Sequence, residues 1–149
     1  MRSISKFFIL LISFFVLANC GSSNFFPIKK GKAGGLFELS EAGKQYTFYN
    51  SAQILNLNTE TFISFDEFTE LSKGKSENDH FTLNFSLNES GKTKFKEMTA
   101  RNVQKQICFV IKDKIIMAPI VTAAIPDGKV MVTLNNETDM QEIVDYLKN

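Results

Sequence analysis

The stretch Phe81-Thr82-Leu83-Asn84-Phe85-Ser86-Leu87 decides the fold class of this 149-residue chain. Its odd positions are apolar and its even positions are polar, which is the period of a strand with one buried and one solvent-facing side. Asn88 follows directly, and asparagine is favoured at the start of a helix. We therefore expect a strand over 81–87 that passes into a helix ending near Gln104, with Phe95, Met98 and Val103 on its buried side.

Downstream of this helix the sequence predicts a hairpin. Residues 107–111 are apolar on both faces, which is typical of a central strand. Lys112-Asp113 fits a two-residue turn, because aspartate tolerates left-handed backbone geometry. Residues 115–117 then return as the partner strand, and Pro119 should end it or place it at an edge, since proline donates no ladder hydrogen bond.

The C-terminal quarter predicts one more strand and one more helix. Val130, Val132 and Leu134 alternate with polar residues. Residues 138–141 fit a capping box, in which the first and fourth residues satisfy each other's free amides. The helix that follows has an apolar stripe formed by Met140, Ile143, Val144 and Leu147.

Upstream, the pattern predicts a strand near residues 46–57 and a short helix over 65–71. Ser64 and Glu67 stand at the two positions of a second capping box. The expected element order is therefore β-α-β-α-β-β-β-α. It indicates an α+β fold, a two-layer sandwich of a mostly antiparallel sheet with helices on one face.

The first twenty residues read as an export leader. Arg2 and Lys6 precede an apolar stretch over 7–17, which is shorter than the roughly 20 residues of a spanning helix. The quartet 17–20, Leu-Ala-Asn-Cys, resembles a bacterial lipobox, although Asn19 replaces the usual small residue. The resemblance implies a signal peptide over 1–19 that is removed, and acylation of Cys20 by diacylglycerol and a further chain such as palmitate. An uncleaved N-terminal anchor helix is the alternative.

Residues 20–44 predict a lipidated cysteine followed by a flexible tether, and residues 45–149 the folded domain. Gly, Ser and Lys dominate this stretch, and 29–35 should hold no regular structure. Gly21-Ser22-Ser23 contains no acidic residue, which by resemblance to other lipoproteins favours the outer over the inner membrane.

Composition and side-chain chemistry exclude several classes of function. The chain has 17 Lys+Arg against 16 Asp+Glu, so it lacks the basic excess that is typical of proteins that bind nucleic acids. Acylation of Cys20 would leave Cys108 without a partner, and its apolar surroundings indicate a buried structural thiol. His80 beside Asp79 indicates a loop histidine, because a metal site needs three or four convergent donors. We expect no catalytic residue, metal, cofactor or small-molecule substrate, and no binding residue is indicated.

From His80 to its C-terminus the chain resembles the head subdomain of the first periplasmic domain of SecD, in the SecD/SecF protein-export family. Three segments carry the resemblance: residues 87–95 with Met98, Thr99 and Asn102; residues 107–111 and 115–119; and Ile125 with Gly128 before the last strand and helix. Lys112-Asp113 departs from the Asp-Gly that the family usually has at the turn. SecD's proton-driven motor lies in transmembrane helices without counterpart in these residues, so the resemblance implies the fold of the head, not a proton-coupled translocase.

Two functions of different classes follow. The first is a non-catalytic lipoprotein of the bacterial cell envelope that binds polypeptide or an envelope protein complex, with a link to protein transport suggested by the resemblance. An open sheet edge near Pro119 could accept an extended segment by strand addition. The alternative is a structural or assembly lipoprotein that acts through self-association. An enzyme with a site around His80 and Asp79 is a third reading.

Overall fold

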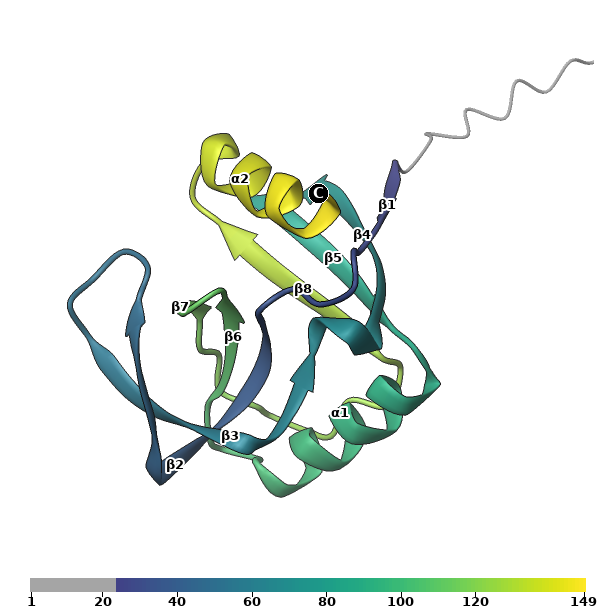
Figure 1. Ribbon diagram of the computed structural model, residues 1–149. Helices are drawn as coiled ribbons and strands as arrows, with labels where there is room; N and C mark the ends of the chain where they lie inside the picture. Colours follow the sequence, from purple (N-terminus) through teal and green to yellow (C-terminus); the bar gives the residue numbers. More distant parts are fainter. Residues whose placement is uncertain (1–23) are drawn as a thin grey trace, which may run out of the picture.

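The computed structural model describes residues 24–149, so the leader and Cys20 lie outside the described residues. Two four-stranded sheets and two helices make up the molecule (Figure 1). The first sheet, sheet A, is antiparallel throughout and has the order β1-β4-β5-β8. Its strands are β1 (Phe25–Pro27), β4 (Phe68–Lys75), β5 (Phe81–Leu87) and β8 (Lys129–Leu134).

The second sheet, sheet B, has the order β3-β2-β6-β7 and curls back on itself. Its strands are β2 (Gly34–Phe48), β3 (Ile54–Ser64), β6 (Ile107–Ile111) and β7 (Lys114–Met117). The start of β2 pairs with β6, and its far end pairs in parallel with β7, at Thr47 opposite Lys114 and Phe48 opposite Ile115. Both Leu39 and Lys44 pair with Leu57, so the residues between them bulge out and bend the strand. The expected single sheet is therefore two sheets, one of them strongly curled.

Both helices contact β5 and start at an asparagine cap. Helix α1 (Glu89–Arg101) begins after Asn88, whose side chain accepts from the Gly91 amide at 2.8 Å, as the sequence predicted. Helix α2 (Glu137–Lys148) begins after Asn136, whose side chain accepts from the Asp139 amide at 2.8 Å. The predicted cap near Thr138 is wrong by two residues.

Helix α1 ends at Arg101, three residues before the predicted end. Val103 therefore lies outside the helix and is 40% exposed, not buried as expected. Phe95 and Met98 are buried as predicted, and so are all four apolar residues of the α2 stripe. The buried apolar face of α1 ends one turn earlier than predicted, because the chain leaves the helix at Asn102 and leads into β6.

A shared aromatic core joins the two sheets. Phe109 of β6 lies with its ring centroid 5.1 Å from that of Phe85 on β5 and 5.8 Å from that of Phe65. Phe68 of β4 packs against the same group, and all four rings are at most 1% exposed. A smaller core fills the curl of sheet B, formed by Phe37, Tyr46, Leu57, Cys108, Val110 and Ile115.

The helix predicted over residues 65–71 does not form. The chain makes one 3-10 turn, η1 (Phe65–Glu67), and then enters β4, and Ser64 makes no side-chain cap hydrogen bond. Pairing of β4 with β1 and β5 satisfies its backbone on both sides and buries Leu71 completely. A local capping signal is weaker than this two-sided ladder.

The tether predicted over residues 20–44 is wrong where the structure describes it. Residues 25–27 form β1, and β2 begins at Gly34. Ile28, Leu36 and Phe37 are all buried, and the amide of Lys29 donates to the carbonyl of Leu147 at 2.8 Å. Gly35 has a φ of +137°, and a Cβ there would lie 2.0 Å from the Ile63 carbonyl oxygen. This glycine therefore serves close strand approach, not flexibility.

Candidate functional site

Two apolar pockets lie at opposite ends of β8. This strand is an edge of sheet A, because β5 is its only strand partner among the described residues. Leu134, at the end of β8, lines a pocket of about 200 Å³. Val130 and Met131, near its start, line a second pocket of about 190 Å³. The open edge of a strand therefore runs between two hollows that can accept side chains.

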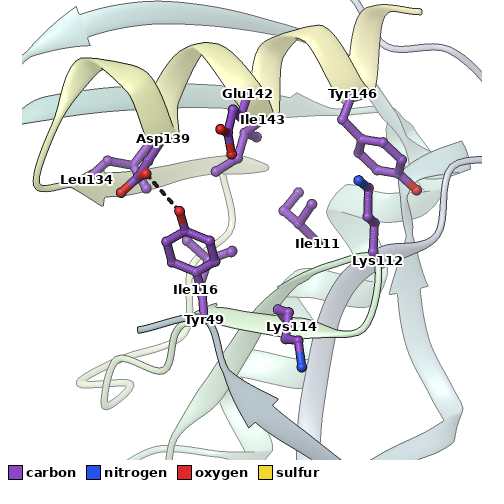
Figure 2. A pocket seen from close by; sticks show the side chains of 10 residues that line it. All are labelled: Tyr49, Ile111, Lys112, Lys114, Ile116, Leu134, Asp139, Glu142, Ile143 and Tyr146. Atoms are coloured by element: carbon purple, nitrogen blue, oxygen red, sulfur yellow. Dashed lines mark hydrogen bonds between the residues drawn. The ribbon is translucent and has the colours of Figure 1, made fainter. Parts of the chain in front are cut away.

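The first pocket lies between α2 and the β6–β7 hairpin (Figure 2). Its floor is aliphatic, formed by Ile111, Ile116, Leu134 and Ile143. Its rim is divided by charge, with Lys112 and Lys114 on the hairpin side and Asp139 and Glu142 on the helix side. Such a site suits an apolar side chain whose neighbours carry polar or charged groups.

The β6–β7 turn positions the basic side of this rim. It is the two-residue turn that the sequence predicted, between Ile111 and Lys114. The left-handed residue is Lys112, with φ +57°, and not Asp113. The ammonium groups of Lys112 and Lys32 each lie 4.9 Å from the ring centroid of Tyr146, which is within cation–π range.

Tyr49 connects the end of β2 to α2 across this pocket. Its hydroxyl donates to Oδ1 of Asp139 at 2.8 Å, and Oδ2 of the same carboxylate accepts from Asn136 at 2.8 Å (Figure 2). The hydrogen bond to Asp139, together with the charge of Asp139, raises the pKa of Tyr49 above its ordinary value. Tyr49 is 50% exposed, so this contact spans the mouth of the pocket and not its floor.

The second pocket lies between α1, β7 and the loop that leads to β8. Phe95, Thr99 and Met117 contribute to its wall, and Ile120 and Met131 are 61% and 57% exposed beside it. The Thr99 hydroxyl donates to the Phe95 carbonyl at 2.7 Å and accepts from the Ile125 amide at 2.9 Å. This buried hydroxyl fixes the loop against α1, so the pocket keeps its apolar wall.

The open edge expected near Pro119 is partly covered. Strand β7 ends at Met117, as a strand stopped by Pro119 should. However, the Ile107 amide donates to the Pro119 carbonyl at 3.1 Å, and the Val121 amide donates to the Lys105 carbonyl at 2.9 Å. The free edge of the site is therefore that of β8, because the segment after β7 pairs back onto the segment before β6.

A buried polar network joins β2 to the end of α1, and no local sequence pattern predicts it. The Glu38 carboxylate accepts from Nε of Arg101 at 2.6 Å and from Nη2 at 3.0 Å. It also accepts from the Thr61 hydroxyl at 3.2 Å and from the side-chain amide of Asn102. Burial raises the pKa of Glu38, but the hydrogen bonds from Arg101 and Asn102 and the charge of Arg101 outweigh it and hold the pKa below its ordinary value. Glu38 lies in the stretch whose composition predicts a tether, and Arg101 and Asn102 lie more than sixty residues away in sequence, so the contact depends on the fold.

The residues that the sequence singled out for chemistry lie apart. Cys108 is fully buried, as predicted, and burial raises the pKa of its thiol to about 12. Asp79 and His80 are exposed in the β4–β5 loop and line neither pocket. Within residues 24–149, no group of three or more His, Cys, Asp and Glu side chains could hold a metal ion. In the same range, no helix is long and apolar enough to cross a membrane.

The described residues thus form a small α+β domain with a curled sheet and two apolar pockets beside an edge strand. The family profile of the SecDF P1 head subdomain matches residues 40–145. The chain belongs to this SecDF P1 head subdomain family, which confirms the resemblance found in the sequence. The match begins after β1 and after Glu38, so both lie outside it, whereas Thr61, Arg101 and Asn102, the partners of Glu38, lie within it.

A curated relative and two solved structures agree with this assignment. The protein translocase subunit SecD of Rickettsia conorii (strain ATCC VR-613 / Malish 7) is 31% identical over 70 residues, which are 47% of this chain and 14% of that protein. A crystal structure of SecDF in a super-membrane-facing form shares the fold with a TM-score of 0.60 at 16% identity, covering 77% of this chain and 18% of that one. A structure of SecDF, described as a membrane component that enhances protein export, gives the same score and identity and is covered to 61%. The chain thus corresponds to less than two thirds of each of these proteins.

Proposed function

We propose that this protein is an exported lipoprotein, acylated at Cys20, whose domain binds extended polypeptide segments at the cell envelope in support of protein export. Its membership of the SecDF P1 head subdomain family supports the link to export. The leader over residues 1–19 and the lipobox-like quartet support the anchor. The domain acts by binding, and it carries out no covalent chemistry.

The free edge of β8 between two apolar pockets is the observation that carries this proposal. An incoming segment that pairs with β8 satisfies backbone groups that β5 leaves open. Six residues of strand span roughly 20 Å, so a segment of that length reaches from one pocket to the other. Because main-chain hydrogen bonds do not depend on side chains, pairing with β8 accepts segments of many sequences. The two pockets then favour segments with apolar side chains at the matching positions.

The charged rim of the first pocket fits the same ligand class. Lys112 and Lys114 line the hairpin side of an aliphatic floor, and Asp139 and Glu142 line its helix side. A segment with an apolar side chain and a charged neighbour of either sign therefore finds an opposite charge nearby. This tolerance is expected of a domain that meets many different polypeptides.

Peptide binding tests the site. Fluorescence anisotropy with a labelled peptide of alternating apolar residues should show binding that Ile120→Ser or Met131→Ser weakens about tenfold, because each change removes apolar contact area. Ile54→Ser is the matched control, since Ile54 is 52% exposed on β3 and lines neither pocket. Equal affinity of the control and the two pocket variants would overturn the assignment of the site.

The strand-addition geometry has its own test. A peptide methylated on alternate backbone nitrogens cannot complete a ladder, so its affinity should fall although its side chains are unchanged. Undiminished binding would leave the pockets as side-chain sites only. Light scattering on the full chain distinguishes peptide binding from the alternative function, self-association. A stable closed oligomer would indicate that β8 pairs with β8 of a second copy.

The anchor is tested at Cys20. Mass spectrometry of the mature N-terminus should find residues 1–19 removed and acyl chains on Cys20. Cys20→Ala should release the protein from the envelope membrane fraction, which we propose to be the outer membrane. An unacylated native N-terminus would disprove this part of the proposal and leave the peptide site untouched.

A further inference from the structure

The N-terminal end of sheet A carries an aromatic and basic surface that the peptide site does not use. Phe25 is 57% exposed, and the ring of Phe26 lies 4.8 Å from the ammonium of Lys148 and 5.8 Å from that of Lys73. Lys29 follows β1 directly and donates to the Asn149 carbonyl at 2.6 Å. We call these five residues the β1 patch: Phe25, Phe26, Lys29, Lys73 and Lys148.

The positive charge of this patch is only partly compensated. None of its lysines forms an ion pair with another residue of the described range 24–149. Two carboxylates lie close by, Glu70 on β4, opposite Pro27, and Asp145 on α2, which accepts from Gln141. Three ammonium groups against two carboxylates leave a small positive excess, and two of the ammonium groups lie beside the half-buried ring of Phe26.

The short length of chain between Cys20 and β1 limits how far the β1 patch can lie from a bilayer that holds an acylated Cys20. Phe25 is five residues beyond Cys20, and five fully extended residues span about 17 Å at most. A domain of this size has a radius of gyration of about 14 Å, so its diameter exceeds that reach. An acyl chain on Cys20 therefore holds the β1 end of the domain at the bilayer. Helix α1 lies at the other end of the molecule (Figure 1).

We propose that the β1 patch docks on the surface of a bilayer containing anionic phospholipid. Phe25 enters the headgroup layer, and Lys29, Lys73 and Lys148 contact lipid phosphates. This inference rests on the proposed acylation of Cys20, because only a short tether brings the patch to the membrane. Docking fixes the domain in one orientation, so the peptide site keeps a constant relation to the membrane surface.

Distance to labelled lipid tests the orientation. The full lipidated protein is reconstituted in phosphatidylglycerol/phosphatidylcholine vesicles with a dye at Asn149→Cys beside the patch, or at Ala100→Cys on α1 as the matched site. Cys108 is buried and its pKa is about 12, so it does not compete for the dye. Energy transfer to a headgroup-labelled acceptor should be clearly stronger from position 149 than from position 100. In pure phosphatidylcholine vesicles this difference should shrink.

The lysines are tested by charge removal. Lys73→Gln and Lys148→Gln should each lower the docked-to-undocked ratio about fivefold, the effect expected for one lysine at an anionic surface. Lys96→Gln, on the exposed face of α1, should leave it unchanged. Equal transfer from positions 149 and 100 in protein that stays on phosphatidylglycerol vesicles would overturn docking but not anchoring. Protein that leaves the vesicles and shows an unacylated Cys20 would overturn both.

Discussion

Sheet A and sheet B are built on different kinds of contact. In sheet A the register between β5 and β8 runs without interruption from Phe81 opposite Leu134 to Ser86 opposite Lys129. In sheet B the strand β2 bulges, bends and closes onto β7. The smaller core of sheet B has six buried members, whereas the aromatic core is shared by both sheets. Sheet A therefore depends on repeated local alternation, and sheet B on a few close backbone approaches and one polar network.

Removing a ring of the shared core should have the largest effect, because it acts on both sheets. Phe109→Ala deletes a side chain that contacts Phe65, Phe68 and Phe85, and should lower the free energy of unfolding by about 3–5 kcal/mol. Urea unfolding followed by circular dichroism measures this change. Phe25→Ala, at a 57% exposed ring, should cost less than about 0.5 kcal/mol. Similar losses for the two variants would show that the shared core does not join the sheets.

Gly35→Ala should open sheet B alone. A Cβ at this position would meet the Ile63 carbonyl oxygen, and φ +137° is strained for alanine, so we expect a loss of about 2–3 kcal/mol. The readout is the rate at which a thiol reagent labels Cys108, which lies in the small core of sheet B.

Gly31→Ala is the control for this prediction. Gly31 also has a positive φ, of +78°, but a Cβ there meets nothing within 4 Å. We expect a loss of about 1 kcal/mol from the left-handed backbone and little change in Cys108 labelling. If both glycine variants label at the same rate, the close approach of β2 to β3 is not what holds the curl.

Glu38→Gln should cost about 1–2 kcal/mol at neutral pH, since it weakens charge-assisted hydrogen bonds to a half-exposed Arg101. The pKa of Glu38 is lower in the folded than in the unfolded protein. Its contribution is therefore complete above the ordinary glutamate pKa, about 4.3, and is lost as the pH falls through the folded-state value. The difference between wild type and variant, measured by urea unfolding, should shrink in that acid range, and a difference that stays constant there would contradict the role of the Glu38 carboxylate.

The smallest effect on stability is expected where α2 meets the end of β2. Asp139→Asn removes the charge that disfavours ionisation of Tyr49, so the pKa of Tyr49 should fall toward its ordinary value. Ultraviolet absorbance of tyrosinate during an alkaline titration follows this directly, and Tyr49→Phe identifies the transition that belongs to Tyr49. An unchanged titration in Asp139→Asn would mean that the contact across the pocket does not persist in solution.

The same contrast explains what could be predicted from the sequence. The strand over 81–87, the 107–117 hairpin and the C-terminal helix follow from alternation or periodicity within one short stretch. The start of sheet B does not, because Gly34-Gly35 has the composition of a linker while its strand partner lies some seventy residues away. The pockets were missed for the same reason, since Tyr49 and Asp139 meet only through the fold. A short stretch of sequence predicts the periodicity of a strand or helix, but it does not predict which distant segment will pair with that element or line a pocket with it.

The hydrogen bond between the Lys29 amide and the Leu147 carbonyl has an evolutionary consequence. The polypeptide enters and leaves this body at one point, and neighbouring entry and exit are what permit a module to be inserted into the loop of a host protein. The matched region makes up 14% of the SecD chain from Rickettsia conorii, so in that protein it is embedded in a much longer polypeptide. Fusion or excision of the coding segment before β1 and after α2 would leave both sheets and both cores intact.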